Sequence, residues 1–142
     1  MGMIYIQQVD YMNVESMQET HESEIQILNE IDNLAIDLDR GEIELATLEA
    51  KIDEYIEHVH HHFSSEEKMM QEYDFPAYEM HKMAHDMFLA DLEYATRYWK
   101  QYGDIKKIIN FVRKTPEWIV MHVNSVDSPT ADFIAKKQEQ LK

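Results

Sequence analysis

Two pairs of side chains, one of a histidine with a glutamate and one of two histidines, are spaced so that they can meet in the core of a helical protein. His62 and Glu66 are four residues apart, and His81 and His85 repeat that spacing. Residues four apart lie on one face of an α-helix, about one turn from each other, so both members of a pair can reach the same point. Because imidazole nitrogens and carboxylate oxygens are ligands for divalent ions, the pairs indicate a metal site.

Three further residues complete the candidate set. His21 lies on an earlier apolar segment, and His122 and Asp127 lie on a late one. Five residues correspond to about 500° of rotation on a regular α-helix, so His122 and Asp127 would diverge by roughly 140°. Ser128 precedes Pro129, and a residue before proline disfavours helical geometry. We therefore expect the helix to end near Asp127, so that its carboxylate bends back toward the core.

The donor count suits two metal ions better than one. Five imidazoles and two carboxylates are too many for one tetrahedral zinc ion. If Glu66 and Asp127 each bridge two octahedral ions such as iron, they fill about four of roughly twelve positions, the histidines fill about five and a bridging oxygen about two. One position is then left for a small molecule. The chain has no cysteine, which excludes thiolate zinc sites, iron–sulfur clusters and disulfides.

The segments that carry these residues have the composition and periodicity of helices. Apolar residues recur at spacings of three and four, and the few Gly and Pro residues fall between the segments. Short connections between four helices predict an all-α, antiparallel up-down four-helix bundle in a single domain, with a short extra C-terminal helix. The expected helices lie near 12–39, 44–72, 76–101 and 104–127, and the extra helix begins at about 130.

Composition and charge exclude several classes of function. The 28 acidic and 13 basic residues give a net charge of −15, which argues against binding to nucleic acid or to an anionic membrane surface. No apolar run reaches the roughly 18 residues of a membrane span, and the N-terminus does not have the pattern of a secretion signal. We expect a cytoplasmic protein and make no prediction of its oligomeric state.

The residues around the candidate ligands resemble the hemerythrin family. Residues 62–70, HFSSEEKMM, resemble the family motif His-Phe-x-x-Glu-Glu-x-x-Met, and residues 81–85 resemble the His-x-x-x-His that follows it. Residues 118–127 resemble Trp-Leu-x-x-His-Ile-x-x-x-Asp, and residues 21–31 resemble the first-helix His with its downstream Asn-x-Leu. His85 stands where related iron-repair proteins have Glu, which favours the oxygen-binding branch of the family.

This resemblance implies a cofactor and a function. The cofactor would be two iron ions with a bridging oxo or hydroxo group, and the protein would bind dioxygen reversibly for storage, delivery or sensing, without being an enzyme. The resemblance implies that Trp118 and Ile119 are walls of the oxygen pocket that exclude water. By position, it implies that His81, His85 and His122 hold one iron, that His21 and His62 hold the iron with the open position, and that Glu66 and Asp127 bridge the two.

Three positions depart from the family pattern. Thr20 stands where Gln usually precedes the first-helix His, and Tyr5 is the nearest substitute for an N-terminal Trp. Glu24 stands where an apolar residue usually lies near the oxygen pocket. Either the helix rotates, Ile25 takes the inner position and Glu24 extends to solvent, or Glu24 reaches the open iron or donates a proton beside it. The second case would favour an enzyme that reduces peroxide or dioxygen.

Ordinary packing is an alternative for single residues but explains the whole set poorly. A surface salt bridge accounts for His62 and Glu66 alone, and a solvated pair accounts for His81 and His85 alone. Seven such residues on the inward faces of four helices favour a metal site, because buried charge is costly without a partner. A bundle that stores iron or holds a structural metal is a third hypothesis.

Other positions carry structural expectations. Pro116 would disrupt a helix interior, so we expect the fourth helix to kink there or to restart at Thr115. We place His58 outside the site, Glu67 on a solvated helix face, and methionines such as Met83 and Met87 in core or boundary packing.

Overall fold

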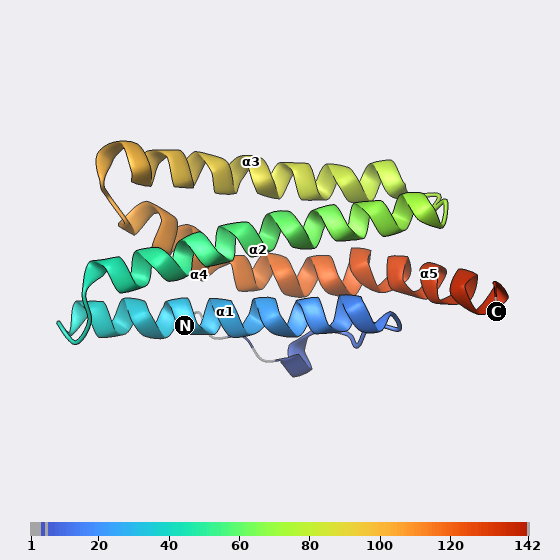
Figure 1. Ribbon diagram of the computed structural model, residues 1–142, viewed down its shortest axis with the longest axis horizontal. Helices are drawn as coiled ribbons and strands as arrows, with labels where there is room; N and C mark the ends of the chain where they lie inside the picture. The colour runs from blue at the N-terminus through green and yellow to red at the C-terminus, as the bar shows by residue number, and fades with distance from the viewer. Residues whose placement is uncertain (1–3, 5, 142) are drawn as a thin grey trace.

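The computed structural model describes residue 4 and residues 6–141, so that Tyr5 lies outside the described residues. Its four main helices pack antiparallel, which confirms the expected four-helix bundle, and a further helix extends from the last of them (Figure 1). The elements are the 3₁₀ helix η1 (Ile6–Gln8), α1 (Glu15–Asp39), α2 (Leu45–Glu72), α3 (Tyr78–Tyr102), α4 (Lys106–His122), the π-helical turn η2 (Val123–Asp127) and α5 (Ser128–Gln140).

Each helix buries one stripe, and the stripe changes from apolar to polar along its length. On α2, Leu48, Ile52, Tyr55 and Val59 follow one another at spacings of four and three, and all are fully buried. The same stripe continues into His62, which is also buried. The apolar half of the bundle therefore fixes the helix rotation that turns the histidines inward.

Side chains of α1 hold the N-terminal segment, and Asn29 makes a paired contact with it. The Asn29 amide oxygen accepts the Ile4 backbone N–H at 3.0 Å, and its amide nitrogen donates to the Ile4 carbonyl at 2.7 Å. Ile4 itself is buried. This paired contact leaves no polar group of Ile4 unsatisfied beneath the segment.

The last helix is longer and more continuous than the sequence predicts. Helix α4 runs through Pro116, so the expected restart at Thr115 is wrong; the Thr115 hydroxyl donates to the Phe111 carbonyl at 2.9 Å within the same stretch of helix. The expected end near Asp127 is also wrong. The chain makes a π turn there, in which the Ser128 N–H bonds to the carbonyl five residues earlier, and continues helically as α5.

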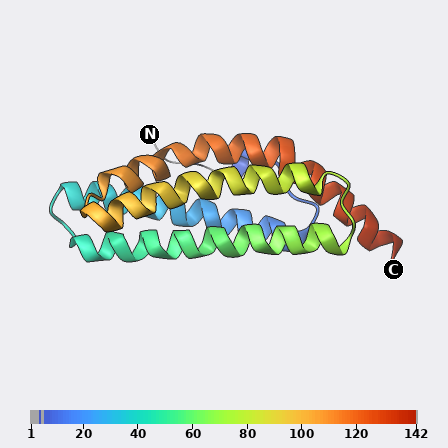
Figure 2. The same cartoon turned by 90° about the horizontal axis from the view of Figure 1, so that it is seen from above.

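Helix α5 extends past the connection between α2 and α3, as the view from above shows (Figure 2). Phe133 of α5 packs against Phe75 of that connection with ring centroids 5.3 Å apart. Gln138 donates to the Tyr73 hydroxyl at 3.4 Å. The C-terminal extension is thus fastened to the end of the bundle where α2 finishes.

Several methionines lie on the outer surface of α3 and α4. Met80, Met83, Met87 and Met121 have exposed fractions of 71, 63, 66 and 73%. The expectation that Met83 and Met87 pack in the core or at its boundary is therefore wrong. Within the described part of the chain, none of the helices combines the length and apolarity that a membrane span requires.

Candidate metal centre

The structure brings all seven sequence-predicted ligand residues together inside the bundle. Each is at most 5% exposed. Every one of the main helices contributes, and the π turn contributes the last carboxylate. The residues are His21 from α1, His62 and Glu66 from α2, His81 and His85 from α3, His122 from α4 and Asp127 from η2.

Glu66 directs its two carboxylate oxygens at different histidines. Its Oε2 atom lies 2.6 Å from Nε2 of His62 and 3.7 Å from Nε2 of His21. Its Oε1 atom lies 3.2 Å from Nε2 of His85 and 3.4 Å from Nε2 of His81. The carboxylate therefore stands between two sets of imidazoles.

Asp127 makes the same division from the opposite side. Its Oδ2 atom lies 3.0 Å from Nε2 of His21, and its Oδ1 atom lies 2.9 Å from Nε2 of His81 and 3.0 Å from Nε2 of His122. The π turn makes this possible, because one wide turn brings residues five apart onto nearly the same face. The two carboxylates thus define a two-histidine group, His21 and His62, and a three-histidine group, His81, His85 and His122.

The spacing of these donor atoms fits a metal ion in each group. Ligands about 2.1 Å from an ion and at right angles to each other lie about 3.0 Å apart. Five buried atoms around the three-histidine group lie within 4.8 Å of one another, with contacts of 2.9–3.4 Å between nitrogen and oxygen atoms, yet none has a hydrogen-bond partner among the described residues. They are Nε2 of His81, His85 and His122, Oε1 of Glu66 and Oδ1 of Asp127. Lone pairs that converge in a buried space without donors are arranged for a cation.

The outer nitrogen of a ligand histidine is Nδ1, which points away from the centre. Hydrogen bonds at Nδ1 fix the ring orientation and the tautomer of two histidines of the three-histidine group. The Thr130 hydroxyl donates its proton to the Val126 carbonyl, so at 2.8 Å it must accept the Nδ1 proton of His81. The Glu67 carboxylate accepts the Nδ1 proton of His85 at 2.9 Å. With the proton on Nδ1, a neutral imidazole offers the lone pair of Nε2 to the centre.

In the absence of a metal, protons balance the two buried carboxylates. Burial lowers the pKa of His21 and of His81, but the carboxylates of Asp127 and Glu66, which lie close to Nε2 of each ring, outweigh it and raise each pKa to about 9. Burial opposes ionisation of Glu66, yet the charge of His62 and hydrogen bonds from the surrounding histidines hold its pKa well below the usual value. The cluster is therefore a strong site for positive charge.

Glu24 points inward rather than to solvent. It is only 5% exposed, and the neighbouring Ile25 is buried as well, so the expected rotation that would release Glu24 does not occur. Its Oε2 atom lies 3.3 Å from Nδ1 of His62, on the side of the ring away from Glu66. The contact places Glu24 behind a ligand histidine. Thr20 makes no contact of this kind, since its hydroxyl donates to the Ser16 carbonyl.

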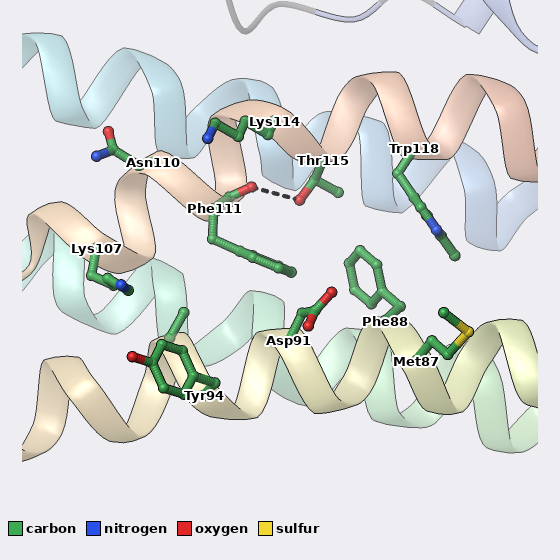
Figure 3. A pocket seen from close by; sticks show the side chains of 11 residues that line it. Met87, Phe88, Asp91, Tyr94, Lys107, Asn110, Phe111, Lys114, Thr115 and Trp118 are labelled. Atoms are coloured by element: carbon green, nitrogen blue, oxygen red, sulfur yellow. Dashed lines mark hydrogen bonds between the residues drawn. The ribbon is translucent and has the colours of Figure 1, made fainter.

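Trp118 and Ile119 lie beside the centre on α4. The Trp118 ring stacks on His122 with centroids 4.3 Å apart, so it covers the three-histidine group, and Ile119 is buried. Phe63 stacks on His85 in the same way at 3.9 Å. Trp118 also stands at one end of a groove of about 650 Å³ between α3 and α4, and none of the seven ligand candidates lines that groove (Figure 3).

A smaller cavity reaches the two-histidine group. It has a volume of about 340 Å³, and its lining includes the buried His62 and Glu66 together with exposed residues such as Ser16 and Glu19. The lining residues come from α1 and α2. The cavity therefore connects the surface with the group that has fewer protein donors.

Sequence reasoning missed the residues that hold the outer nitrogens. Glu67 was expected on a solvated face, but it is half-buried and bonded to His85. Thr130 was not singled out, although it follows Asp127 by three residues and so lies on the same helix face. For Glu67 the only signal is its place in the motif, because its partner lies on another helix. His58 lies outside the seven-residue cluster, with its ring centroid 6.1 Å from that of His62.

Four antiparallel helices around a buried cluster of histidines and carboxylates define a metal-binding helical bundle. The profile of the Hemerythrin HHE cation binding domain matches residues 12–129. The chain belongs to the hemerythrin family, as the resemblance in its motifs predicts.

Similarity to two bacteriohemerythrins and a myohemerythrin supports this membership. Bacteriohemerythrin of Aquifex aeolicus (strain VF5) is 31% identical over 116 residues, which cover 81% of this chain and 85% of that protein. Bacteriohemerythrin of Ralstonia nicotianae (strain ATCC BAA-1114 / GMI1000) is 31% identical over 86 residues, 61% of this chain and 62% of that protein. Myohemerythrin of Sipunculus nudus is 32% identical over 78 residues, 55% of this chain and 58% of that protein. No solved structure matches the chain.

Proposed function

We propose that this protein holds two iron ions and binds dioxygen reversibly, for storage, delivery or sensing. The observation that carries the proposal is the division of the two carboxylates, since Glu66 and Asp127 each direct one oxygen at the two-histidine group and one at the three-histidine group. A pair of bridging carboxylates suits two ions a few ångströms apart, and the mixed imidazole and carboxylate donors suit iron.

The residues divide between the two ions as the contacts do. His81, His85 and His122 would hold one ion, His21 and His62 would hold the other, and both carboxylates would be shared. When bound, the iron ions would supply the electrons and the coordination position that dioxygen needs. The group with two histidines has fewer protein donors, so we assign dioxygen to that side.

The surrounding residues control access to this side. The cavity between α1 and α2 reaches His62 and Glu66, so a small molecule can approach the two-histidine group from solvent. Trp118 and Phe63 cover His122 and His85, which keeps water from the three-histidine group. We retain Ile119 as a wall that excludes water, because it is buried on the helix that carries His122. Exclusion of water slows irreversible oxidation of a reduced centre.

The alternative is a di-iron enzyme that reduces peroxide or dioxygen with the help of Glu24. A buried carboxylate near the centre favours this alternative, because a carboxyl group can deliver a proton to a reduced oxygen species. Its contact is with the outer nitrogen of His62, however, and this places it behind the ring. We therefore favour reversible binding over catalysis.

We also propose that residues 1–142 form one cytoplasmic domain. Its partner would be dioxygen and neither a nucleic acid nor a membrane.

Repeated oxygenation of the iron-loaded protein tests the proposal. The metal-free protein is loaded with Fe(II) without oxygen, exposed to air and then deoxygenated, while the visible spectrum and the iron content are recorded. We expect two irons per chain and recovery of the spectrum of the reduced protein over many cycles. Steady consumption of added peroxide would favour the enzyme instead, and uptake of many irons per chain would favour storage.

A further inference from the structure

Glu24 is a buried carboxylate whose nearest ionisable contact is a histidine of the proposed centre. It lies on α1 three residues after His21 and is 5% exposed. The His62 ring stands between two carboxylates, with Nδ1 at 3.3 Å from Glu24 Oε2 and Nε2 at 2.6 Å from Glu66 Oε2. A buried carboxylate is costly without a partner, so this contact requires a role.

We propose that Glu24 is a positioning residue for the two-histidine group, accepting the Nδ1 proton of His62 and thereby fixing the lone pair of Nε2 toward the ion. The inference rests on the proposed two-ion centre and adds a residue that the family motif does not contain. An imidazole with one nitrogen on a metal carries its proton on the other, and a carboxylate there makes the ring a stronger donor.

The contact of Glu24 with His62 should affect the ion of the two-histidine group alone, because the three-histidine group has a carboxylate of its own. Glu67 accepts from Nδ1 of His85 at 2.9 Å, and His85 belongs to the three-histidine group. Each group therefore has one histidine that is backed by a carboxylate outside the ligand set. Glu24 and Glu67 form a matched pair on α1 and α2, and exchanging one should affect the ion on its own side.

The charge of Glu24 also sets the sign of a redox effect. A nearby negative charge stabilises the more positive, oxidised ion and so lowers its reduction potential. Glu24→Gln keeps a hydrogen-bond acceptor for His62 but removes the charge. Glu24→Leu removes both and leaves the Nδ1 proton without this acceptor in a buried position.

Titration of the metal-free protein with Co(II), followed by calorimetry and visible absorption, tests this role apart from oxygen chemistry. The wild-type protein is expected to bind two ions. Glu24→Leu should weaken one of the two binding steps by about 10- to 100-fold, and Glu24→Gln should weaken it less. Glu67→Gln should weaken the other step, while Glu15→Gln, which removes the same charge from an exposed position at the start of α1 outside the cavity lining, should leave both unchanged.

A double-mutant comparison identifies the partner. If Glu24 acts through His62, Glu24→Leu should cause no further loss of affinity in a His62→Ala background. In the iron-loaded protein, Glu24→Gln should move the reduction potential to more positive values. Glu24→Gln remains informative if Glu24→Leu does not fold.

Each contrary result has a distinct meaning. A wild-type protein that binds fewer than two ions would end the proposed function itself. If the wild type binds two ions and the Glu24 variants bind them as Glu15→Gln does, the role of Glu24 is rejected. Glu24, His58 and His62 also offer donor atoms within 4.8 Å of one another, so a third ion lost on His58→Ala would show that Glu24 is a ligand instead.

Discussion

The outer nitrogens of the histidines decide what the centre can bind. An acceptor for the Nδ1 proton of a ligand histidine orients the ring and favours the tautomer whose Nε2 lone pair faces the ion. Thr130 supplies that acceptor for His81 because its own proton is donated to the Val126 carbonyl. The neutral hydroxyl of Thr130 therefore accepts the Nδ1 proton of His81, as the carboxylate of Glu67 accepts that of His85.

Replacement of Thr130 by valine tests this role with almost no change of shape. Thr130→Val should lower the affinity for one of the two ions by about 10- to 100-fold, because His81 loses the acceptor that orients it. Calorimetric titration with Co(II) measures the change. Thr130→Ser keeps the hydroxyl and should bind as the wild type does; a serine variant as weak as the valine variant would mean that packing, not the hydrogen bond, matters.

The stability of the metal-free protein should depend on pH through the histidines of the cluster. Burial lowers the pKa of His62, but the charges of Glu66 and Glu24 hold it well above its ordinary value, so His62 acts in the same direction as His21 and His81. The pKa of His21 and of His81 is raised from 6.5 to about 9 in the folded protein. Their contribution to stability is therefore complete below pH 6.5 and is lost as the pH rises through about 9. The lowered pKa of Glu66 gives stability above its ordinary value of 4.5, so it adds no change in this window. Urea denaturation with a chelator from pH 6 to 10 measures the loss, and a flat profile would contradict it.

The site residues that lie four apart on the same helix were predictable from their spacing alone. The spacing of His62 with Glu66 and of His81 with His85 needs only helix geometry, and the structure brings these residues together. Glu67 was not predictable from spacing because its partner is on α3. The orientation of Glu24 depends on the rotation of α1 in the packed bundle, which a single helix pattern leaves undecided.

At the scale of elements, the last helix departs most from expectation. Proline removes an N–H and crowds the carbonyl four residues earlier, so Pro129 predicts an interruption. A π turn at Val123–Asp127 accommodates the proline, and the chain then continues as a helix. The same turn places Asp127 beside His122, so one local irregularity both accommodates the proline and completes the centre. Sequence propensities describe regular turns and do not anticipate this solution.

The connection between α3 and α4 requires a backbone conformation that residues other than glycine rarely adopt. Gly103 caps α3 at φ 67°, in the left-handed region, and an added Cβ would meet no atom within 4 Å. Gly103→Ala should therefore destabilise the protein through backbone strain alone, by about 1–2 kcal/mol. Denaturant unfolding of the metal-free protein measures this value. Gly103→Asn should lose less, and equal losses would point to another cause.

At the scale of the whole molecule, the centre joins four helices that are far apart in sequence. Each main helix contributes at least one ligand candidate, so an unfolded chain has no preformed site and metal binding adds to folding stability. The bundle itself was predictable because all four apolar stripes have helical periodicity and short connections. The extent of α5 and its contact with the α2–α3 connection were not, because they depend on the uninterrupted last helix.

Metal loading should raise the melting temperature markedly. A ligand at about 100 times its Kd stabilises the folded state by about 2.7 kcal/mol, which corresponds to about 5–10 °C for a domain of this size. Thermal unfolding with and without Fe(II) under nitrogen measures the shift, and a chelator should reverse it. His85→Ala should show a much smaller shift, since it removes a donor from the three-histidine group. An unchanged melting temperature in the wild type would mean that the bundle folds without regard to metal.

Oxidation of the exposed methionines of α3 and α4 should report whether reduced oxygen leaves the metal centre. Thioethers in water are readily converted to sulfoxides by peroxide, and Met80, Met83, Met87 and Met121 all face solvent on the helices that carry the three-histidine group. If oxygen leaves the centre unreduced, peptide mass spectra after many cycles should show these side chains unmodified. If reduced oxygen escapes, the same peptides should gain oxygen atoms in step with the number of cycles, before the buried Met70 is affected.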